Sequence, residues 1–454
     1  MNEGFSKFIV FTNFGEGLSI SYKLQQEGNE VLVGMVGDIQ DAMEKHPEEP
    51  EAKKIRWSSY EGMLEKEDAW KLLERMDKFE DKDEWCVLFD FNTLWKFADK
   101  ALKSGFTKGL FPSRLDSTLE ADRDLAKRFV QKNYPDLKVA EVEQFKTVEE
   151  GIEFLNESDE FWALKGNDTG AKTVVPSSSI HEHATTEIED ALNAEPDIYQ
   201  SKGYIFERQI RDGLEVCPQM IWVDGRRVAS CIDLEDKRLS PNNGASMEGC
   251  AINIIVDTPL DCELNKWAFP PATDLLAKKH KGIFYLDANL IIKDGVAYYL
   301  EFCSNRMGYD AVFAEAEMAG SASEYFNALL RGESPYISKY GVGVRGFSSK
   351  RDDEGNLKDG LRIQYETDEH LWHFAIRKDG NKMFNTKGAF GDSVHGTDLV
   401  AFTEASDDVQ YALQKLQEQV DAYSFPGLYV RSDCSALCSR LDGLQKHITS
   451  VEGE

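Results

Sequence analysis

The spacing of apolar residues in the first third of the chain predicts alternating strands and helices. Phe8 to Thr12 is an apolar run typical of a buried strand, and Gly15-Glu16-Gly17 leads from it into a helical segment, Leu18 to Gln26. Glu30 to Val36 is a second strand by the same criterion. This order of strand, glycine turn, helix and strand predicts a Rossmann-like domain. Because Ile20 stands where the dinucleotide-binding pattern has its third glycine, the segment gives little support for NAD binding.

Other helices are predicted from a period near 3.6 residues and from their capping residues. Leu119 to Lys132 is predicted to form one helix, and the capping box Thr147 to Glu150 begins another. From Val409 to Val420 apolar residues recur every three or four positions, with Ser406 as the candidate N-cap. The polar stretch His181-Glu182-His183 has no second group of ligands nearby, so we predict a surface loop there rather than a metal site.

The middle of the chain is predicted to form an antiparallel sheet. Three apolar segments follow one another closely: Tyr204–Ile210, Val216–Val223 and Arg227–Leu234. Asp224-Gly225 is a tight-turn sequence between the last two.

The segment from Phe284 to Asn305 is predicted to be a hairpin, and its loop length decides which side chains share a face. In a three-residue loop with Gly295 left-handed, Asp287 pairs with Glu301 and one face of the hairpin is entirely apolar. A two-residue loop would put Asp287 and Glu301 on opposite faces and would pair apolar with polar positions. We therefore predict the three-residue loop.

Two carboxylates directly opposite one another on a sheet repel each other unless a positive charge lies between them. Lysine, arginine or solvent could supply the compensation. Alternatively, a divalent cation binds Asp287 and Glu301, with Asn305 as a neutral oxygen ligand. Oxygen ligands of this kind suit Mg²⁺ (or Mn²⁺) bound together with nucleotide phosphates. The hairpin by itself thus allows either carboxylates paired with basic side chains or solvent, or a metal site.

Composition and charge narrow the classes of function. The 454 residues include 52 basic and 81 acidic ones, a formal charge of −29, which makes binding to a nucleic-acid backbone unlikely. ATP can still bind such a protein if its basic residues gather in one place. The length predicts two to four subdomains. No apolar run approaches the ~18 residues of a membrane helix, and Met1 to Lys7 do not resemble a signal peptide, so we expect a cytoplasmic protein with reduced cysteines and no membrane partner.

The hairpin and several stretches before and after it resemble the ATP-grasp enzymes, and in particular the glycinamide ribonucleotide synthetase (phosphoribosylamine–glycine ligase) family. Six stretches resemble the family's motifs, in the same order along nearly the whole chain. They are Phe111 to Ser113 with Leu119 to Arg123, Ala163 to Gly166 with Gly170 to Lys172, Ile205 to Glu207 with Asp212 to Glu215, Glu235 to Arg238 with Pro241 to Gly244, Glu301 to Gly308, and Phe425 to Asp433.

The resemblance implies an α/β fold with three parts. Residues 1–113 would form the Rossmann-like N-terminal domain and 114–335 the ATP-grasp domain, built of antiparallel sheets with helices. Within it, 114–200 would be a mobile ATP subdomain. A small α+β domain at 336–454 would complete the chain.

The resemblance also implies a reaction and its site. An ATP-dependent ligase would join a carboxylate, such as that of an amino acid, to an amine through an acyl phosphate, with ATP and Mg²⁺ as cofactors and a monomer or homodimer as the assembly. The nucleotide contacts would be Arg123, Lys165, Lys172, Glu207, Glu215 and Lys237. The catalytic residues holding the substrate carboxylate and the transferred phosphoryl group would be Arg306 and Arg238.

The half of the family pattern that holds the amine acceptor is altered. Asp90 to Leu94 replaces the family's G-P-E-A-P-L, and one extra residue lies between Glu301 and Arg306. These departures favour a ligase with a changed substrate. An authentic phosphoribosylamine–glycine ligase and a non-catalytic ATP-binding descendant remain open, whereas Ile20 and the carboxylate hairpin disfavour a Rossmann oxidoreductase.

Overall fold

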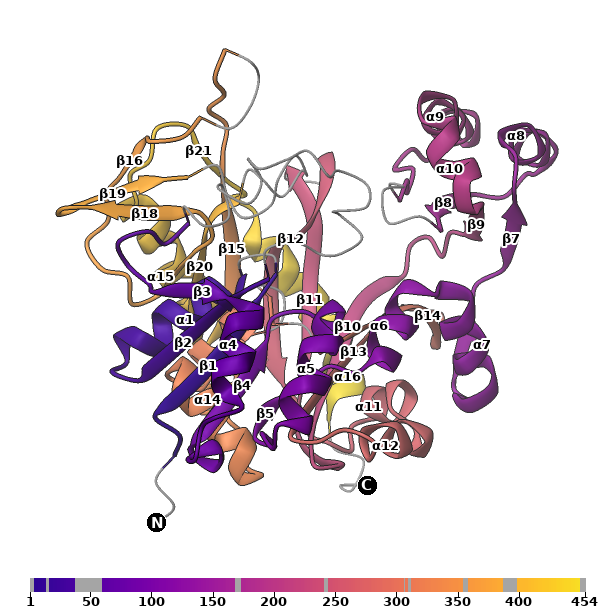
Figure 1. The fold of residues 1–454 in the computed structure, drawn as a ribbon. Helices are drawn as coiled ribbons and strands as arrows, with labels where there is room; N and C mark the ends of the chain where they lie inside the picture. Colours follow the sequence, from indigo (N-terminus) through magenta and orange to yellow (C-terminus); the bar gives the residue numbers. More distant parts are fainter. Residues whose placement is uncertain are drawn as a thin grey trace. The chain divides into compact units, whose positions relative to one another are not determined.

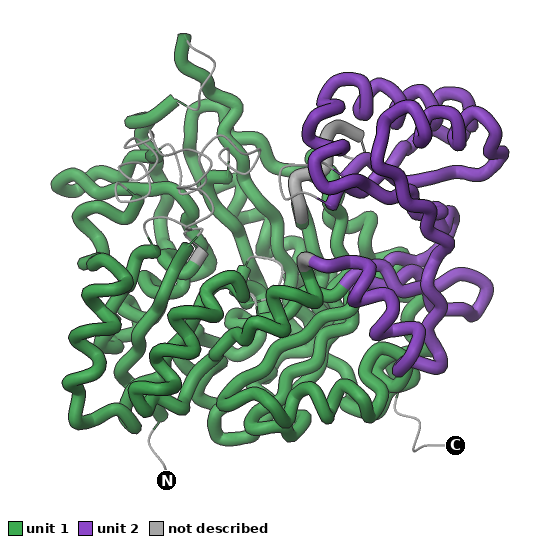
Figure 2. Tube along the Cα trace, turned by 45° about the vertical axis from the view of Figure 1, so that its right-hand side comes forward, with its two compact units in different colours: residues 1–121, 216–288, 302–454 green, residues 122–215, 289–301 purple. Residues whose placement is uncertain are grey.

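The chain forms two compact units. The computed structural model describes residues 4–13, 16–36, 59–167, 173–240, 244–305, 307–308, 312–353, 358–386 and 398–449. Unit 1 consists of Met1–Ala121, Val216–Ala288 and Phe302–Glu454, and unit 2 of Asp122–Glu215 and Asn289–Glu301 (Figure 2). None of the helices within the described ranges combines the length and apolar character needed to cross a bilayer.

The first part of unit 1 is the predicted Rossmann-like arrangement. Strands β1 (Lys7–Thr12), β2 (Glu30–Met35) and β4 (Trp85–Phe89) are parallel with β1 in the centre, and α1 (Glu16–Gln26) connects β1 to β2 (Figure 1). Side chains of β1 point alternately into two apolar clusters, one shared with α1 and the other with α4 (Ala69–Met76) and α5 (Trp95–Lys103). Both faces of β1 are therefore buried, as is usual for a parallel strand.

The turn between β1 and α1 is held by a carboxylate from the end of β4. Asp90 accepts hydrogen bonds from the Thr12 hydroxyl at 2.5 Å, from the Asn13 N–H at 3.1 Å and from the Gly17 N–H at 3.3 Å. A Cβ on Gly17 would lie 2.9 Å from the Thr12 Cβ, which explains the glycine there. Asp90 thus occupies the backbone N–H groups at the start of α1.

The rest of unit 1 is dominated by long antiparallel strands. In order across the sheet these are β10 (Leu214–Val223), β11 (Arg226–Ser240), β12 (Gly244–Asp257), β15 (Tyr340–Ser348), β20 (Asp398–Ser406) and β17 (Leu371–His373). The predicted turn Asp224-Gly225 is confirmed, with φ of 46° and 78°. Helix α15 (Val409–Ala422) packs on β15 and β20. Its predicted N-cap was wrong: Asp408, not Ser406, accepts the N–H groups of Gln410 and Tyr411.

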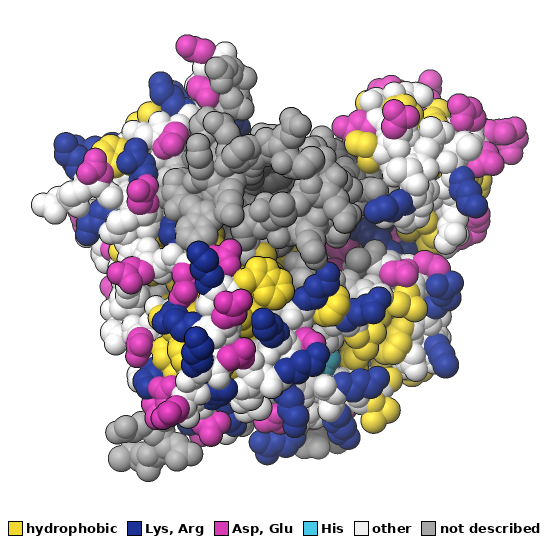
Figure 3. All heavy atoms as spheres, in the orientation of Figure 1, with side chains coloured by type: hydrophobic (Ala, Val, Ile, Leu, Met, Phe, Trp, Pro, Cys, Tyr) yellow, Lys and Arg dark blue, Asp and Glu magenta, His cyan; other side chains and the backbone are white. Residues whose placement is uncertain are grey.

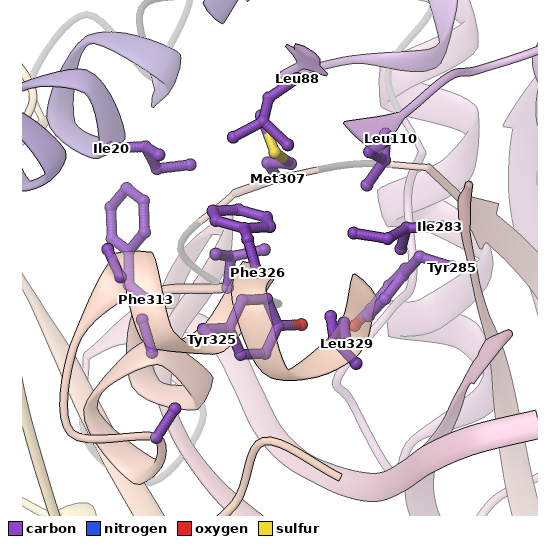
Figure 4. Close-up of a cluster of buried hydrophobic side chains, with 14 of the residues drawn as sticks. Ile20, Leu88, Leu110, Ile283, Tyr285, Met307, Phe313, Tyr325, Phe326 and Leu329 are labelled. Carbon is purple, nitrogen blue, oxygen red and sulfur yellow. The ribbon is translucent and has the colours of Figure 1, made fainter. Parts of the chain in front are cut away.

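An apolar cluster joins these two parts of unit 1. Figure 4 shows Ile20 of α1 and Leu88 of β4 in one cluster with aromatic residues of α14 (Ala322–Arg331) and of β13 (Ile283–Lys293). Phe8 and Val10 of β1 belong to the same cluster. At the start of α14 the Ser321 side chain accepts the Glu324 N–H, and Gly332 ends the helix with φ 78°.

Unit 2 is built around a small antiparallel sheet, β7 (Val142–Phe145), β9 (Tyr204–Arg208) and β8 (Trp162–Gly166), in that order. Helices α8 (Val148–Glu157), α9 (His181–Ala194) and α10 (Pro196–Lys202) pack against it through apolar side chains. The capping box at Thr147 and Glu150 is confirmed. The loop predicted at His181 is wrong, since the helix α9 begins there. Acidic side chains gather over α8 and α9 (Figure 3).

The helix predicted from Leu119 to Lys132 is two helices, α6 (Arg114–Ala121) and α7 (Arg123–Asn133). Asp122 interrupts them because its side chain accepts the Leu125 N–H and caps α7. Short side chains that bond to nearby backbone N–H groups compete with helix continuation in this way. The division between the two units falls at the same residue.

The hairpin formed by β13 and β14 (Val296–Ser304) has a two-residue loop, so the predicted three-residue loop is wrong. Asp294 and Gly295 both have positive φ, 52° and 74°, which is the geometry of a tight type I′ turn. Aspartate tolerates the left-handed conformation, so Asp294 and Gly295 can form this two-residue turn. The alternation of buried residues along β14 shifts by one position, since Ala297 and Tyr299 are buried before the shift and Phe302 and Ser304 after it. Because such a shift moves the side chains beyond it to the other face, the loop length alone does not decide whether Asp287 and Glu301 share a face.

Candidate functional site

A buried group of charged side chains lies inside unit 2. Lys165 on β8 and Glu207 on β9 are diagonal neighbours on one face of the sheet, with the Lys165 Nζ 2.5 Å from the Glu207 Oε1. Lys127 from α7 contacts the other oxygen of Glu207. The three residues are 3 to 7% exposed, so two ammonium groups share one carboxylate away from water.

Lys127 was not predicted from the sequence. It lies one helical turn after Arg123, so the two side chains share a face of α7. Burial first, and then the charges of Lys165 and Arg123, lower the pKa of Lys127 to about 7. Contact with Glu207 favours the ammonium form, but burial and two like charges outweigh it.

Two more predicted residues meet beside this group. The Arg123 guanidinium lies 3.6 Å from the Glu301 carboxylate, and both side chains are partly exposed, at 28 and 35%. Glu301 also acts on Lys127, favouring its charged form. Arg123, Lys165, Glu207 and Glu301 are therefore gathered in one part of unit 2, together with Lys127. We call these five residues the unit 2 charge cluster.

Other predicted residues lie in unit 1, around the buried thiol of Cys217. Burial and then the carboxylates of Asp287, Glu235 and Asp233 raise the pKa of Cys217, whereas Lys237 lowers it. The Lys237 Nζ is 2.9 Å from the Glu235 Oε1. Asp287 accepts the Cys303 N–H at 3.1 Å. Asp287 and Lys237 thus both lie near Cys217.

Arg238 contributes its backbone to a second ionic network of unit 1. The Arg431 guanidinium, 2% exposed, donates to the Arg238 carbonyl and to the carboxylates of Asp236 and Asp433. Arg440 contacts Asp236 as well. The segment Phe425 to Asp433, which resembles a family motif, therefore stabilises β11 through the hydrogen bonds of Arg431. The side-chain roles of Arg238 and Glu215 stay predictions.

Asn305 has a structural role in unit 1. Its amide oxygen accepts the Tyr285 N–H at 2.9 Å, and its amide nitrogen donates to Asp116 at 2.8 Å. Asp116 in turn lies 2.9 Å from the His280 Nε2. These buried bonds account for the Asn305 side chain without a metal ion. Arg306 and Lys172, the other predicted site residues, lie outside the described residues.

The fold is similar to several solved structures at low sequence identity. Phosphoribosylamine–glycine ligase from Thermotoga maritima matches with a TM-score of 0.64 and 16% identity, covering 94% of this chain and 99% of that one. The biotin carboxylase domain of 2-oxoglutarate carboxylase from Hydrogenobacter thermophilus, solved with MgADP and bicarbonate, matches at 0.57 and 11%, covering 99 and 96%. L-amino acid ligase from Bacillus licheniformis matches at 0.52 and 13%, covering 92 and 98%.

No family model and no curated protein matches the sequence. The similarity is carried by the arrangement of the elements, and it extends over nearly the whole of this chain and of each of the three structures. These proteins are ATP-grasp enzymes, so the predicted fold class is confirmed. The chain has the ATP-grasp fold.

Proposed function

We propose that the protein is an ATP-dependent, ADP-forming ligase that joins a carboxylate to an amine. The observation that carries this proposal is the unit 2 charge cluster, in which three cations and two carboxylates are gathered beside a three-stranded sheet. The fold supports the same reaction, since two of the similar structures are ligases of amino acids by name.

The cations of the unit 2 charge cluster suit the phosphates of ATP. Arg123, Lys127 and Lys165 can each donate to phosphate oxygens and offset their negative charge, which is most of what phosphoryl transfer requires of a protein. Glu207 keeps the two buried lysines together until the nucleotide arrives, and it is the candidate acceptor for the ribose hydroxyls. Lys172 is proposed to add a further phosphate contact, Glu215 to bind the nucleotide beside Glu207, and Lys237 to bind its phosphates.

The carboxylates Asp287 and Glu301 offer the hard oxygen donors that Mg²⁺ prefers. Glu301 is partly exposed, so it can exchange its Arg123 partner for an ion. Asn305 fits this role poorly, since its amide is committed to Tyr285 and Asp116. Bound magnesium would offset charge on the phosphates. The assignment of Asp287 and Glu301 remains a proposal from the sequence.

The chemistry proposed has two steps. A carboxylate oxygen of the substrate attacks the γ-phosphorus of ATP, the bond to the β-phosphate oxygen breaks, and ADP leaves with that electron pair. The amine then attacks the carbonyl carbon of the acyl phosphate, and inorganic phosphate leaves as the amide forms. Arg306 and Arg238 are proposed to hold the carboxylate and the transferred phosphoryl group, because a guanidinium matches both.

An ADP-release screen of amino acids against amines tests the reaction. We expect release that requires Mg²⁺ and one particular pair of substrates, with a Glu301→Gln variant at least ~10-fold slower because a phosphate-side carboxylate is lost. Glycine with phosphoribosylamine is one arm of the screen. Turnover with that pair would identify the authentic activity of the family. Magnesium-dependent ATP binding without any turnover would instead support the non-catalytic alternative. Unchanged activity in Glu301→Gln would contradict the role of this residue.

ATP binding is expected to take up protons near pH 8. With a pKa of about 7, Lys127 is mostly neutral at that pH, and nearby phosphates favour its charged form. We expect uptake of up to about one proton at pH 8 and almost none at pH 6, where Lys127 is already protonated. Calorimetric titrations in buffers of different ionisation enthalpy measure this uptake. A Lys127→Met variant that took up protons as the wild type does would contradict the assignment.

A further inference from the structure

The face of the sheet formed by β10, β11 and β12 carries polar side chains among otherwise apolar strands of unit 1. Cys217 lies directly opposite Asp233, and Glu235 directly opposite Asn253. Residues opposite one another in an antiparallel sheet point to the same side, and residues two apart on one strand do so as well. Cys217, Asp233, Glu235 and Asn253 therefore share one face.

Three side chains of this region come close enough to hold one ion. Ligand atoms of Asp233, Glu235 and Cys250 lie within 4.8 Å of one another. Asp233 and Cys250 are each 1% exposed and Glu235 is 9% exposed. Ligand atoms around tetrahedral zinc are about 3.3–3.8 Å apart, given bonds of about 2.0–2.3 Å. Side-chain rotations that bring these ligand atoms about 1 Å closer together would give the spacing of a tetrahedral zinc site.

Asn253 provides an independent observation. It is 1% exposed, and neither its amide oxygen nor its amide nitrogen has a hydrogen-bond partner among the described residues. On the neighbouring strand β15 the residue opposite Asn253 is Gly343, which has no side chain that could form a hydrogen bond with it. A buried amide with both atoms unsatisfied is rare, and a bound ion would satisfy its oxygen. Its position opposite Glu235 directs the amide toward the same group of ligands.

We propose that Asp233, Glu235 and Cys250 bind a divalent transition-metal ion, Zn²⁺ being the best match, with the Asn253 amide oxygen as the fourth ligand. A sulfur ligand favours zinc over magnesium. On binding, the Cys250 thiol, which now donates weakly to the Ile252 carbonyl at 3.4 Å, loses its proton to solvent. Glu235 keeps Lys237 at one oxygen, since a carboxylate can serve an ammonium and an ion through its two oxygens. This ligand set differs from the residues proposed for magnesium.

Cobalt(II) titration of the full-length protein, stripped with a chelator, tests the site. A thiolate bound to Co²⁺ gives a charge-transfer absorption band in the near ultraviolet, which carboxylates and amides do not give. The titration uses a Cys434→Ser/Cys438→Ser background, because these two half-buried thiols could bind cobalt themselves. We expect the band to saturate at one equivalent of Co²⁺, and Zn²⁺ to displace it.

Matched variants separate the site from general effects of substitution. Cys250→Ser is expected to abolish the band, whereas Cys262→Ser, which removes another buried thiol of unit 1, is expected to leave it unchanged. Asn253→Ala is expected to weaken Co²⁺ binding at least ~10-fold with the band retained. If protein with all the proposed ligands intact gives no band, the proposal is overturned, and this result does not depend on the folding of any ligand variant. A band that persists in Cys250→Ser also overturns the proposal. The readout needs neither ATP nor turnover, so it is independent of the proposed ligase activity.

Discussion

Replacing Glu207 with alanine is expected to lower the free energy of unfolding by about 3–5 kcal/mol at pH 6, where Lys127 is protonated, because two buried ammonium groups lose their shared carboxylate. Hydrogen exchange of peptides from β8 and β9, followed through denaturant, measures the loss where it arises. Glu160→Ala removes an exposed partner of Arg208 in the same unit and should cost no more than about 1 kcal/mol.

The loss in Glu207→Ala should shrink as the pH rises from 6 to 9. The Glu207 carboxylate contacts Lys127 and favours its charged form, so removing the carboxylate lowers the pKa of Lys127 below the wild-type value of about 7. Between the two folded-state pKa values the wild type binds more protons than the variant, so the advantage of the wild type decreases as Lys127 loses its proton. A deficit that is the same at pH 6 and pH 9 would show that Lys127 is not a charged neighbour of Glu207.

Lys165→Gln is expected to have the largest effect on nucleotide binding. One charge-assisted hydrogen bond contributes about 1.5–3 kcal/mol, so MgATP affinity should fall about 10- to 150-fold. Glutamine keeps the polar end while removing the charge, which limits damage to the contact with Glu207. Equilibrium binding of a fluorescent ATP analogue gives the dissociation constant.

Lys146→Gln serves as the control for this measurement, since Lys146 is an exposed lysine of the same unit. It should bind the analogue as the wild type does. Equal losses in Lys165→Gln and Lys146→Gln would point to a general electrostatic effect and against a phosphate contact at Lys165.

Several predicted site residues that are far apart along the chain lie together in the structure, and they come from motifs that follow one another in a fixed order. Arg123, Lys165, Glu207 and Glu301 are separated along the chain, yet all four meet in unit 2. Lys127 escaped prediction because a lysine in a helix is normally solvated. Its spacing of four residues from Arg123 was the available signal.

Three of the local errors involve aspartate, whose short side chain can accept nearby backbone N–H groups and which tolerates the left-handed conformation. Asp122 ends one helix and caps the next, Asp408 takes the N-cap in place of Ser406, and Asp294 adopts the left-handed conformation that a two-residue turn needs. Periodicity of apolar residues gives no information about these choices. The hairpin register therefore could not be settled from the alternation of apolar residues alone.

The Asp90 carboxylate affects whether a phosphate group can bind at the edge of the Rossmann-like sheet. In a dinucleotide-binding protein the N–H groups after the first strand receive a pyrophosphate. Here a resident anion, supplied by the chain itself, already occupies the N–H groups of Asn13 and Gly17. An incoming phosphate would have to displace the Asp90 carboxylate and would be repelled by its charge. The glycine turn after β1 therefore resembles a cofactor-binding loop in sequence, whereas in the structure its N–H groups stabilise the fold by hydrogen bonding to Asp90.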